Sequence, residues 1–297
     1  MKRIDSDLVK EATGVTVEMT NFDAIGLVDS EISGRVLAFL EHPRYALKLK
    51  RSRSIKGVFV RAEHADAVPE GIEPIVVDDP KWFFFSLVDY LAKTKVRSKT
   101  VISGKTQIHP SASIAENGVR IEDDVVIEPG VVVMPDVRIC KGATLRAGCV
   151  LGVDGFEHKR TSRGILSVAH DGSLLVGENV EIGVNTFVPK GFSYRIAIIG
   201  DDTKIDALVH YGHAVQCGRR CFIAANAMIG GNLTLGDDVW IGPSASIANR
   251  LTIGDGAFVT FGSVVTRNVP AGGKVTGNFA IPHDVFLKNL KKSLSGD

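Results

Sequence analysis

An apolar residue at every sixth position is the feature that most constrains the fold of this chain. The first series is Ile121, Ile127, Val133, Ile139, Leu145 and Leu151, and the small residues Val125, Val131, Val137, Ala143 and Cys149 lie four positions after its first five members. A period of six fits neither an α-helix, with about 3.6 residues per turn, nor an alternating strand. It is typical of a triangular β-coil in which three hexapeptides complete one turn of about 18 residues.

The same spacing returns after residue 175 and continues almost to the C-terminus. The second series is Val176, Ile182 and Val188, followed by Ile199, Ile205, Tyr211, Cys217, Ile223, Ile229, Leu235, Ile241, Ile247, Ile253, Val259 and Val265. Residues 152–175 and 189–198 fall outside the register, so we expect loops there on the surface of the coil. Either segment could be a plain surface loop, but their length and their Phe, His, Lys and Arg side chains favour walls of a substrate site.

The hexapeptide is absent from the first 100 residues. Residues 55–63 and 73–79 have the composition of short strands, and residues 80–94 predict a helix that begins at Pro80. The sequence therefore predicts a mainly β protein with three parts: a small α/β domain at 1–100, a β-helix at 101–277 and a C-terminal helical segment at 278–297. An amphipathic helix at 283–294 would cap the open end of the coil.

Composition excludes several classes of partner. Lys and Arg number 35 and Asp and Glu number 34, a balance that gives no reason to expect nucleic acid or an anionic membrane surface. No apolar stretch approaches the roughly 18 residues that cross a bilayer, and acidic residues lie where a signal peptide needs an apolar core. We therefore expect a cytoplasmic protein with no membrane span. The four cysteines form no CxxC pair, which favours reduced thiols over disulfides or zinc ligands.

Four blocks of sequence resemble one family of sugar-nucleotide acyltransferases. They are FLEHPRY at 39–45, VVVMPDVRI with LGVDGFE at 131–157, VGENVEIG at 176–183, and IDALVHYGHAV at 205–215. They are similar to UDP-3-O-acylglucosamine N-acyltransferases of lipid A biosynthesis and to relatives that acylate amino sugars for surface polysaccharides. The resemblance extends over almost the whole chain. It implies a left-handed coil, a homotrimer with active sites between subunits, and an acyl thioester as donor.

The resemblance also implies a nucleotide site in the N-terminal domain. Phe39 and Tyr45 match the aromatic pair that holds the base, and an aromatic face can stack any base. The alternative is that both are ordinary core aromatics. His42 stands where the family has Asn, and an imidazole cannot reproduce the hydrogen-bonding edge of an amide. Asp154 and Phe156, in the DGF segment, are further candidates for substrate binding.

His213 is the candidate general base. An amine must lose a proton to attack a thioester, and an imidazole with a pKa near neutrality is suited to accept it. The family's catalytic His aligns with His213, and Ala214 replaces the Asn that follows it. One coil further along lies Gly231, whose backbone N–H could stabilise the tetrahedral oxyanion. The alternative for Gly231 is a glycine that only turns a corner.

Four other residues are candidates for binding the two substrates. His210 lies where lipid A enzymes have Gln, and it could orient the sugar or itself be the base. Arg250 replaces a second family His and could meet a phosphate or the pantetheine arm, although a solvated arginine is the alternative. The segment RNVPAGGKVTGNFAIP resembles a donor channel, which makes Arg267 and Lys274 candidates for contacting donor phosphates.

The preferred hypothesis is transfer of an acyl group from acyl-CoA or acyl carrier protein to a nucleotide-linked amino sugar for surface polysaccharide, with no bound cofactor or metal. The region after Pro282 is shorter than the helical extension of lipid A enzymes, which favours this hypothesis. The alternative is the UDP-3-O-(3-hydroxyacyl)glucosamine N-acyltransferase of lipid A biosynthesis. More remote are a zinc-dependent carbonic anhydrase-like β-helix, with His210 and His213 as ligands, and a noncatalytic scaffold.

Overall fold

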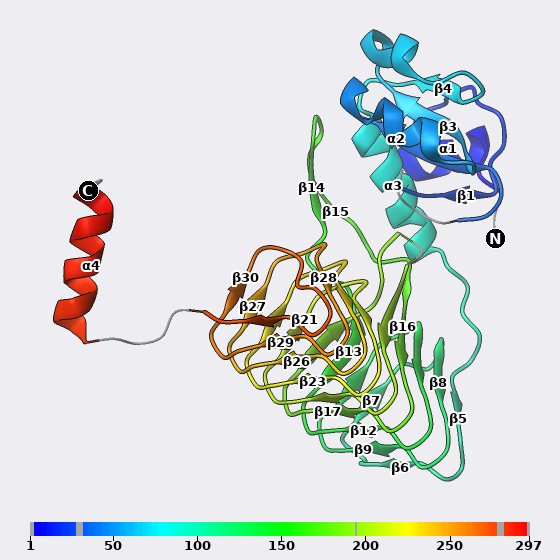
Figure 1. Ribbon diagram of the computed structural model, residues 1–297. Helices are drawn as coiled ribbons and strands as arrows, with labels where there is room; N and C mark the ends of the chain where they lie inside the picture. Colours follow the sequence, from blue (N-terminus) through cyan, green and yellow to red (C-terminus); the bar gives the residue numbers. More distant parts are fainter. Residues whose placement is uncertain (1–2, 28–31, 194, 278–281, 296–297) are drawn as a thin grey trace.

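The computed structural model describes residues 3–27, 32–193, 195–277 and 282–295 of the chain. Its largest part is a coil of short parallel strands; a smaller α/β unit lies to one side of the coil, and an antiparallel hairpin rises beside that unit (Figure 1). The strands of the coil form three parallel sheets, which we call the first, second and third faces in the order in which the chain reaches them.

Each complete coil contributes one strand to each face, and β31 adds one more strand to the second face. The first face contains β5 (Val101–Ile102), β8 (Val119–Ile121), β11 (Val137–Ile139), β16 (Ser173–Val176), β19 (Ile196–Ile199), β22 (Gln216–Cys217), β25 (Thr234–Leu235) and β28 (Thr252–Ile253). The second contains β6 (Gln107–Ile108), β9 (Val126–Ile127), β12 (Thr144–Leu145), β17 (Glu181–Ile182), β20 (Lys204–Ile205), β23 (Phe222–Ile223), β26 (Trp240–Ile241), β29 (Phe258–Val259) and β31 (Lys274–Val275). The third contains β7 (Ser113–Ile114), β10 (Val132–Val133), β13 (Val150–Val153), β18 (Phe187–Pro189), β21 (His210–Tyr211), β24 (Met228–Ile229), β27 (Ser246–Ile247) and β30 (Val264–Val265).

The hexapeptide positions form the interior of the coil. Every residue of the two sixfold series is buried, with at most 6% of its surface exposed, and the small residues at the fourth offset are buried with them. On the third face His210 pairs with Met228 and Met228 with Ser246, which confirms the expected coil of 18 residues. Corner residues such as Asn226, Asn232 and Asp238 have a left-handed φ, which Asn and Asp tolerate. The fold is the expected left-handed parallel β-helix.

The N-terminal unit is a four-stranded parallel sheet covered by helices. Its strands are ordered β1 (Ala24–Ile25), β2 (Val36–Leu40), β3 (Ile55–Val60) and β4 (Glu73–Val76), and its helices are α1 (Ser6–Thr13), α2 (Ala46–Arg51) and α3 (Pro80–Lys93). Two 3₁₀ turns, Pro43–Tyr45 and Ala62–Ala67, complete it. The buried Phe83 and Phe84 of α3 pack on Phe59 and Phe39 of the sheet. The strands and the helix expected at 55–94 are therefore confirmed.

The first insertion forms a hairpin that contacts α3. Its strands are β14 (His158–Thr161) and β15 (Gly164–Ser167), and we call residues 158–167 the hairpin arm. At its tip the backbone N–H of Ser162 donates to Asp79 Oδ2 at 2.6 Å, and the guanidinium of Arg163 lies 3.8 Å from the centre of the Trp82 ring. Just beyond its base, the N–H of Ala169 donates to Asp89 Oδ1 at 2.9 Å. The hairpin arm therefore joins the coil to the N-terminal unit along α3.

The expected C-terminal helix is present as α4 (His283–Ser295). Its side chains are exposed over residues 283–294, including Phe286, Leu290 and Leu294, so within the single chain α4 does not cover the last coil. Its amphipathic pattern fixes a helix but not the surface that the helix meets, and a capping role stays a prediction. None of the helices in the described residues has both the length and the hydrophobicity needed to cross a bilayer.

Candidate active site

His213 lies at the corner that joins the third face to the first. It follows β21, and the next residue, Ala214, completes the corner with a left-handed φ of 55°. The side chain points out of the coil interior toward the two insertions, and 18% of it is exposed. Because coils stack at a spacing of 18 residues, Gly231, Asn249 and Arg267 follow His213 at this same corner in the next three coils. The 18-residue repeat therefore stacks His213, Gly231, Asn249 and Arg267 in one line along this corner, which we call the corner column.

Gly231 is in direct contact with the imidazole of His213. A Cβ atom at this position would lie 2.6 Å from His213 Cε1 and 2.8 Å from Nδ1. The backbone φ of Gly231 is outside the left-handed region, so glycine is needed here for space and not for the turn. Among the residues that the structure describes, none accepts a hydrogen bond from the Gly231 N–H. The structure thus places Gly231 against the His213 ring, and a role for its N–H as oxyanion donor stays a prediction.

Asn232 sets the tautomer of His213. Its Nδ2 lies 3.1 Å from His213 Nε2, and its Oδ1 accepts a hydrogen bond of 2.6 Å from Arg195 Nη1. Because the amide oxygen faces a guanidinium, the amide nitrogen is the atom that donates to the imidazole. Nε2 is therefore an acceptor, and the neutral ring carries its proton on Nδ1.

The DGF segment lies between His213 and a second, buried histidine. His170 is fully buried, and its Nε2 accepts a hydrogen bond of 3.2 Å from the Gly155 N–H. The His170 and His213 rings meet edge to face, with centres 5.7 Å apart. A Cβ at Gly155 would lie 3.2 Å from His170 Nε2 and 3.4 Å from His213 Cβ. A side chain at position 155 would be tight against both histidines and would require His170 to shift by a few tenths of an ångström.

The two substrate-binding candidates of this segment have different surroundings. Asp154 accepts a hydrogen bond from the His170 N–H at 3.2 Å and pairs with Lys190 Nζ at 3.4 Å, so it lies at the edge of the site. Phe156 is 87% exposed and packs on the ring of His158, with ring centres 4.6 Å apart. Asp154 is therefore brought close to the histidine pair, whereas Phe156 faces solvent.

The base of the hairpin arm brings a carboxylate to His213. Glu157 Oε1 lies 3.8 Å from His213 Nε2, and its other oxygen pairs with Lys159 Nζ. Lys159 in turn lies over the ring of Phe85 in α3, 4.5 Å from its centre. Burial lowers the pKa of His213 below its ordinary value, with Glu157 opposing the shift and the nearby cations Lys159, Arg195 and Arg250 reinforcing it. His213 is thus a free base at neutral pH, the form that can accept a proton.

The remaining candidates of the coil are spread along it. His210 lies on the outer side of β21, exposed, and stacks on Phe187 with ring centres 5.2 Å apart. Arg250 is an exposed corner residue whose backbone N–H donates to the Gly231 carbonyl at 3.0 Å. Arg267 belongs to the column of His213, three coils away. Lys274 lies on the second face with its ammonium 5.0 Å from the centre of the Phe258 ring, so a single chain does not bring it to His213.

The aromatic candidates of the N-terminal unit do not form a pair in this structure. Phe39 is half-buried against Phe84 and Phe85, whereas Tyr45 packs on a separate cluster and lies beneath the Arg44 guanidinium at 4.7 Å. His42 is exposed, and its Nδ1 accepts a hydrogen bond from the Arg44 N–H at 3.1 Å. Their role in nucleotide binding stays a prediction.

Several residues at the site were not among the sequence candidates, notably Glu157, Lys159, His170, Arg195 and Asn232. Asn232 could have been found, because it lies one coil beyond Ala214, at the corner next to the candidate base. The others belong to the two insertions, where no register fixes their position. In the described residues no group of three or more His, Cys, Asp or Glu side chains is arranged to hold a metal ion.

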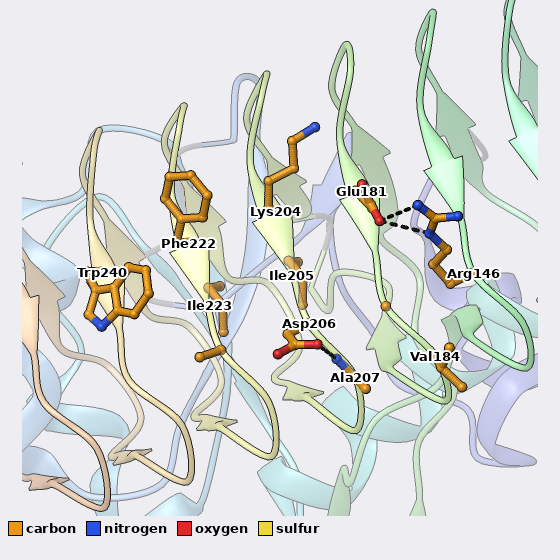
Figure 2. A pocket seen from close by; sticks show the side chains of 12 residues that line it. Arg146, Glu181, Val184, Lys204, Ile205, Asp206, Ala207, Phe222, Ile223 and Trp240 are labelled. Atoms are coloured by element: carbon orange, nitrogen blue, oxygen red, sulfur yellow. Dashed lines mark hydrogen bonds and ion pairs between the residues drawn. The ribbon is translucent and has the colours of Figure 1, made fainter.

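Figure 2 shows a separate groove of ≈ 480 Å³ on the second face. It is lined by Lys204, Phe222 and Trp240, with Arg146 and Glu181 joined by a hydrogen bond of 2.8 Å at one end. The groove does not include His213, which lies at the far edge of the adjacent third face. It is therefore a feature of the outer surface of the coil and not part of the histidine site.

Comparison with known proteins finds the hexapeptide repeat in two segments of the coil. The model of the family described as "Bacterial transferase hexapeptide (six repeats)" matches residues 118–152 and 232–267. The solved structure of a UDP-N-acetylglucosamine acyltransferase from Campylobacter jejuni is 24% identical and aligns with a TM-score of 0.46, covering 58% of this chain and 72% of its own. Both segments matched by the family model lie within the coil, whose left-handed β-helix fold is established by its own strands.

Curated relatives of known name are similar to about half of the chain. UDP-3-O-acylglucosamine N-acyltransferase of Methylobacterium nodulans is 34% identical over 146 residues, which are 49% of this chain and 41% of the relative. The protein of that name from Nitratidesulfovibrio vulgaris is 40% identical over 140 residues, 47% of this chain and 40% of its own length. The chain spans about two fifths of the length of these relatives. The resemblance to UDP-3-O-acylglucosamine N-acyltransferases is therefore confirmed, over about half of the chain and not over almost all of it.

The contact between Gly231 and His213 can be tested directly. Gly231→Ala should force the imidazole out of its place, because the new methyl would overlap three ring atoms. We expect the His213 ring signals to move in an NMR spectrum and the stability to fall by about 1–3 kcal/mol. Gly104→Ala is the control, because a Cβ there meets nothing within 4 Å. Unchanged His213 signals in Gly231→Ala would contradict the arrangement.

The buried His170 predicts an acid-sensitive fold. Burial lowers the pKa of His170 to about 4. Between pH 6.5, its ordinary pKa, and pH 4, the histidine is therefore protonated in the unfolded chain but neutral in the folded chain. Stability should fall by about 3 kcal/mol as the pH drops from 6.5 to 4. In His170→Phe this dependence should be weaker, whereas the exposed-site control His158→Gln should keep it. Chemical denaturation at pH 7 and pH 4.5 gives the free energy of unfolding at each pH. An equal loss of stability between the two pH values in all three proteins would refute the prediction.

Proposed function

We propose that this protein is an N-acyltransferase that transfers an acyl group from a thioester to the amine of a nucleotide-linked amino sugar. The observation that carries the proposal is the contact between the His213 imidazole and Gly231 on the next coil, whose N–H has no hydrogen-bond acceptor among the described residues. A base and an oxyanion donor side by side are what attack of an amine on a thioester requires. The curated relatives and the hexapeptide repeat support the same reaction class.

The chemistry follows from these two groups. The sugar amine attacks the thioester carbonyl while His213 accepts a proton from the amine at Nε2. The carbonyl oxygen becomes an oxyanion, to which the Gly231 N–H donates a hydrogen bond. The intermediate then expels the donor's thiolate, which takes the proton from the imidazolium, and an amide and a free thiol are left. Because neighbouring strands lie about 5 Å apart, both groups can reach one reacting centre.

The acceptor that we place first is UDP-3-O-acylglucosamine. The names of the curated relatives agree with the lipid A alternative better than with the preference for a surface polysaccharide sugar. Other nucleotide-linked amino sugars stay second, because His42, Ala214 and Arg250 depart from the pattern of the lipid A enzymes. The donor is acyl-CoA or acyl carrier protein, with Arg267 as a candidate contact along the corner column of His213. Nucleotide binding by the N-terminal unit and a cytoplasmic location belong to the same proposal.

The outer surface of the coil supports a homotrimer with sites between subunits. Large apolar side chains are exposed on the second face, on the third face and at the corner between them: Phe222, Trp240 and Phe258; Met228 and Val264; Val184, Leu208 and Phe261. Two faces of a prism point in different directions, so one flat partner cannot cover both. In a closed ring each chain contacts two neighbours through two different surfaces, which fits this distribution. A neighbour on the third face would border His213.

The reaction can be tested with a panel of UDP-, GDP- and dTDP-linked amino sugars and acetyl, hydroxybutyryl and long-chain thioester donors. Mass spectrometry should detect an N-acylated product, first with UDP-3-O-acylglucosamine. His213→Asn should reduce transfer at least about 10²-fold while leaving assembly and nucleotide binding unchanged. The exposed His109→Asn serves as the matched control. Near-normal turnover in His213→Asn would reject the assignment of the base.

Assembly is tested at the centre of the exposed aromatic column. Trp240→Glu places a charge between Phe222 and Phe258 and should convert a trimer into monomers, measured by light scattering after gel filtration. Transfer should fall with assembly if the site lies between subunits. Thr234→Glu, on the outer side of the first face, should leave the trimer intact. A monomeric wild-type protein, or a trimeric Trp240→Glu, would show that this surface is not the interface.

A further inference from the structure

The carboxylate of Glu157 lies between His213 and Lys159. Its Oε1 is 3.8 Å from His213 Nε2, and its Oε2 pairs with the ammonium of Lys159. The three side chains are 14%, 18% and 22% exposed for Glu157, His213 and Lys159, so water screens their charges only partly. The position of Glu157 therefore affects the proton affinity of the imidazole more than a surface carboxylate would.

Asn232 and Glu157 favour different protonation states of His213. The Asn232 amide donates to Nε2, and because its oxygen is bound to Arg195 it cannot turn to accept. A proton on Nε2 therefore makes the contact with Asn232 unfavourable. The same proton makes the contact with Glu157 favourable, because a carboxylate attracts an imidazolium. Asn232 thus stabilises the neutral imidazole of His213, and Glu157 stabilises the protonated imidazolium that forms during transfer.

The other groups facing His213 are cationic or neutral. Lys159, Arg195 and Arg250 each oppose its protonation, and His170, edge to face with it, is neutral above a pKa of about 4. Glu157 is the anion that offsets this positive surrounding. Without it, the imidazolium would lie among three cations in a partly buried site.

Lys159 is held where it can compete for the carboxylate. Its ammonium lies 4.5 Å from the centre of the Phe85 ring and 5.7 Å from that of Phe192, and such cation–π contacts restrain its direction. Phe85 belongs to α3, to which the hairpin arm is fixed by Ser162 at its tip and by Ala169 just beyond its base, through Asp79 and Asp89. The docked hairpin arm therefore keeps Lys159 close to Glu157 and limits how fully the carboxylate can turn to His213.

We propose that Glu157 is a positioning residue that stabilises the imidazolium of His213 while the proton travels from the sugar amine to the departing thiolate, and that Lys159 limits this stabilisation. This inference rests on the proposed function, in which His213 carries that proton. In this role Glu157 acts through its charge and exchanges no proton. Its effect and that of Lys159 on His213 have opposite signs, which a merely structural role would not produce.

The test is an NMR titration of the histidine rings, with the His213 signals assigned from His213→Asn. Glu157→Gln removes a negative charge and should lower the pKa of His213, whereas Lys159→Met removes a positive charge and should raise it. Arg160→Met, on the exposed side of the same strand, should leave it unchanged. Shifts in the same direction for both variants, or no shift in either, would overturn the proposal. Thermal unfolding verifies that each variant is folded, and Glu157→Asp should restore part of the wild-type value.

Kinetics add a second readout. The acid limb of the pH dependence of kcat/KM should move to lower pH in Glu157→Gln and to higher pH in Lys159→Met. Glu157→Gln should also lower kcat about 10-fold with little change in KM for the sugar. If no sugar and thioester pair reacts, the proposed function fails while the titration still decides the role of Glu157. If transfer occurs but the acid limb stays in place in both variants, the roles assigned to Glu157 and Lys159 are wrong while the proposed function stands.

Discussion

The stacking of one coil on the next is the constraint on which the rest of the structure depends. An apolar residue at each sixth position fills the interior, and backbone hydrogen bonds between coils fix the repeat at 18 residues. Side chains that are 18 apart in sequence must then lie one above another at the same corner. The contact between His213 and Gly231 is a direct result, because these two residues are 18 apart in the sequence.

The two insertions complete what the coil begins. The first supplies Glu157 and His170, and the second supplies Phe192 and Arg195, so the surroundings of His213 come from segments that interrupt the repeat. The hairpin arm also docks on α3 through Asp79 and Asp89. A site built on the rigid coil is thereby tied to the N-terminal unit, where a nucleotide is expected to bind.

The sequence predicted those parts that obey a register. The sixfold series locates the interior, and counting 18 residues along the sequence pairs His213 with Gly231. Glu157, Lys159 and His170 were missed because an insertion has no period, so its side chains are placed only by contacts with distant segments. Phe39 and Tyr45 show the reverse problem, because matching a motif does not reveal that Phe84 and Phe85 already cover one of the two rings. The helix at 283–294 was predicted from its pattern, which says nothing about what the helix contacts.

The corner column also sets a length. Arg267 follows His213 by three coils, and at about 4.8 Å per coil the two corners lie roughly 14 Å apart along the axis. A flexible molecule held at both points must be extended over that span, and the span can change only in whole coils. If the donor is held at both points, as proposed, the reach that it needs is set in steps of about 5 Å, one for each coil between the corners, without any change at the histidine.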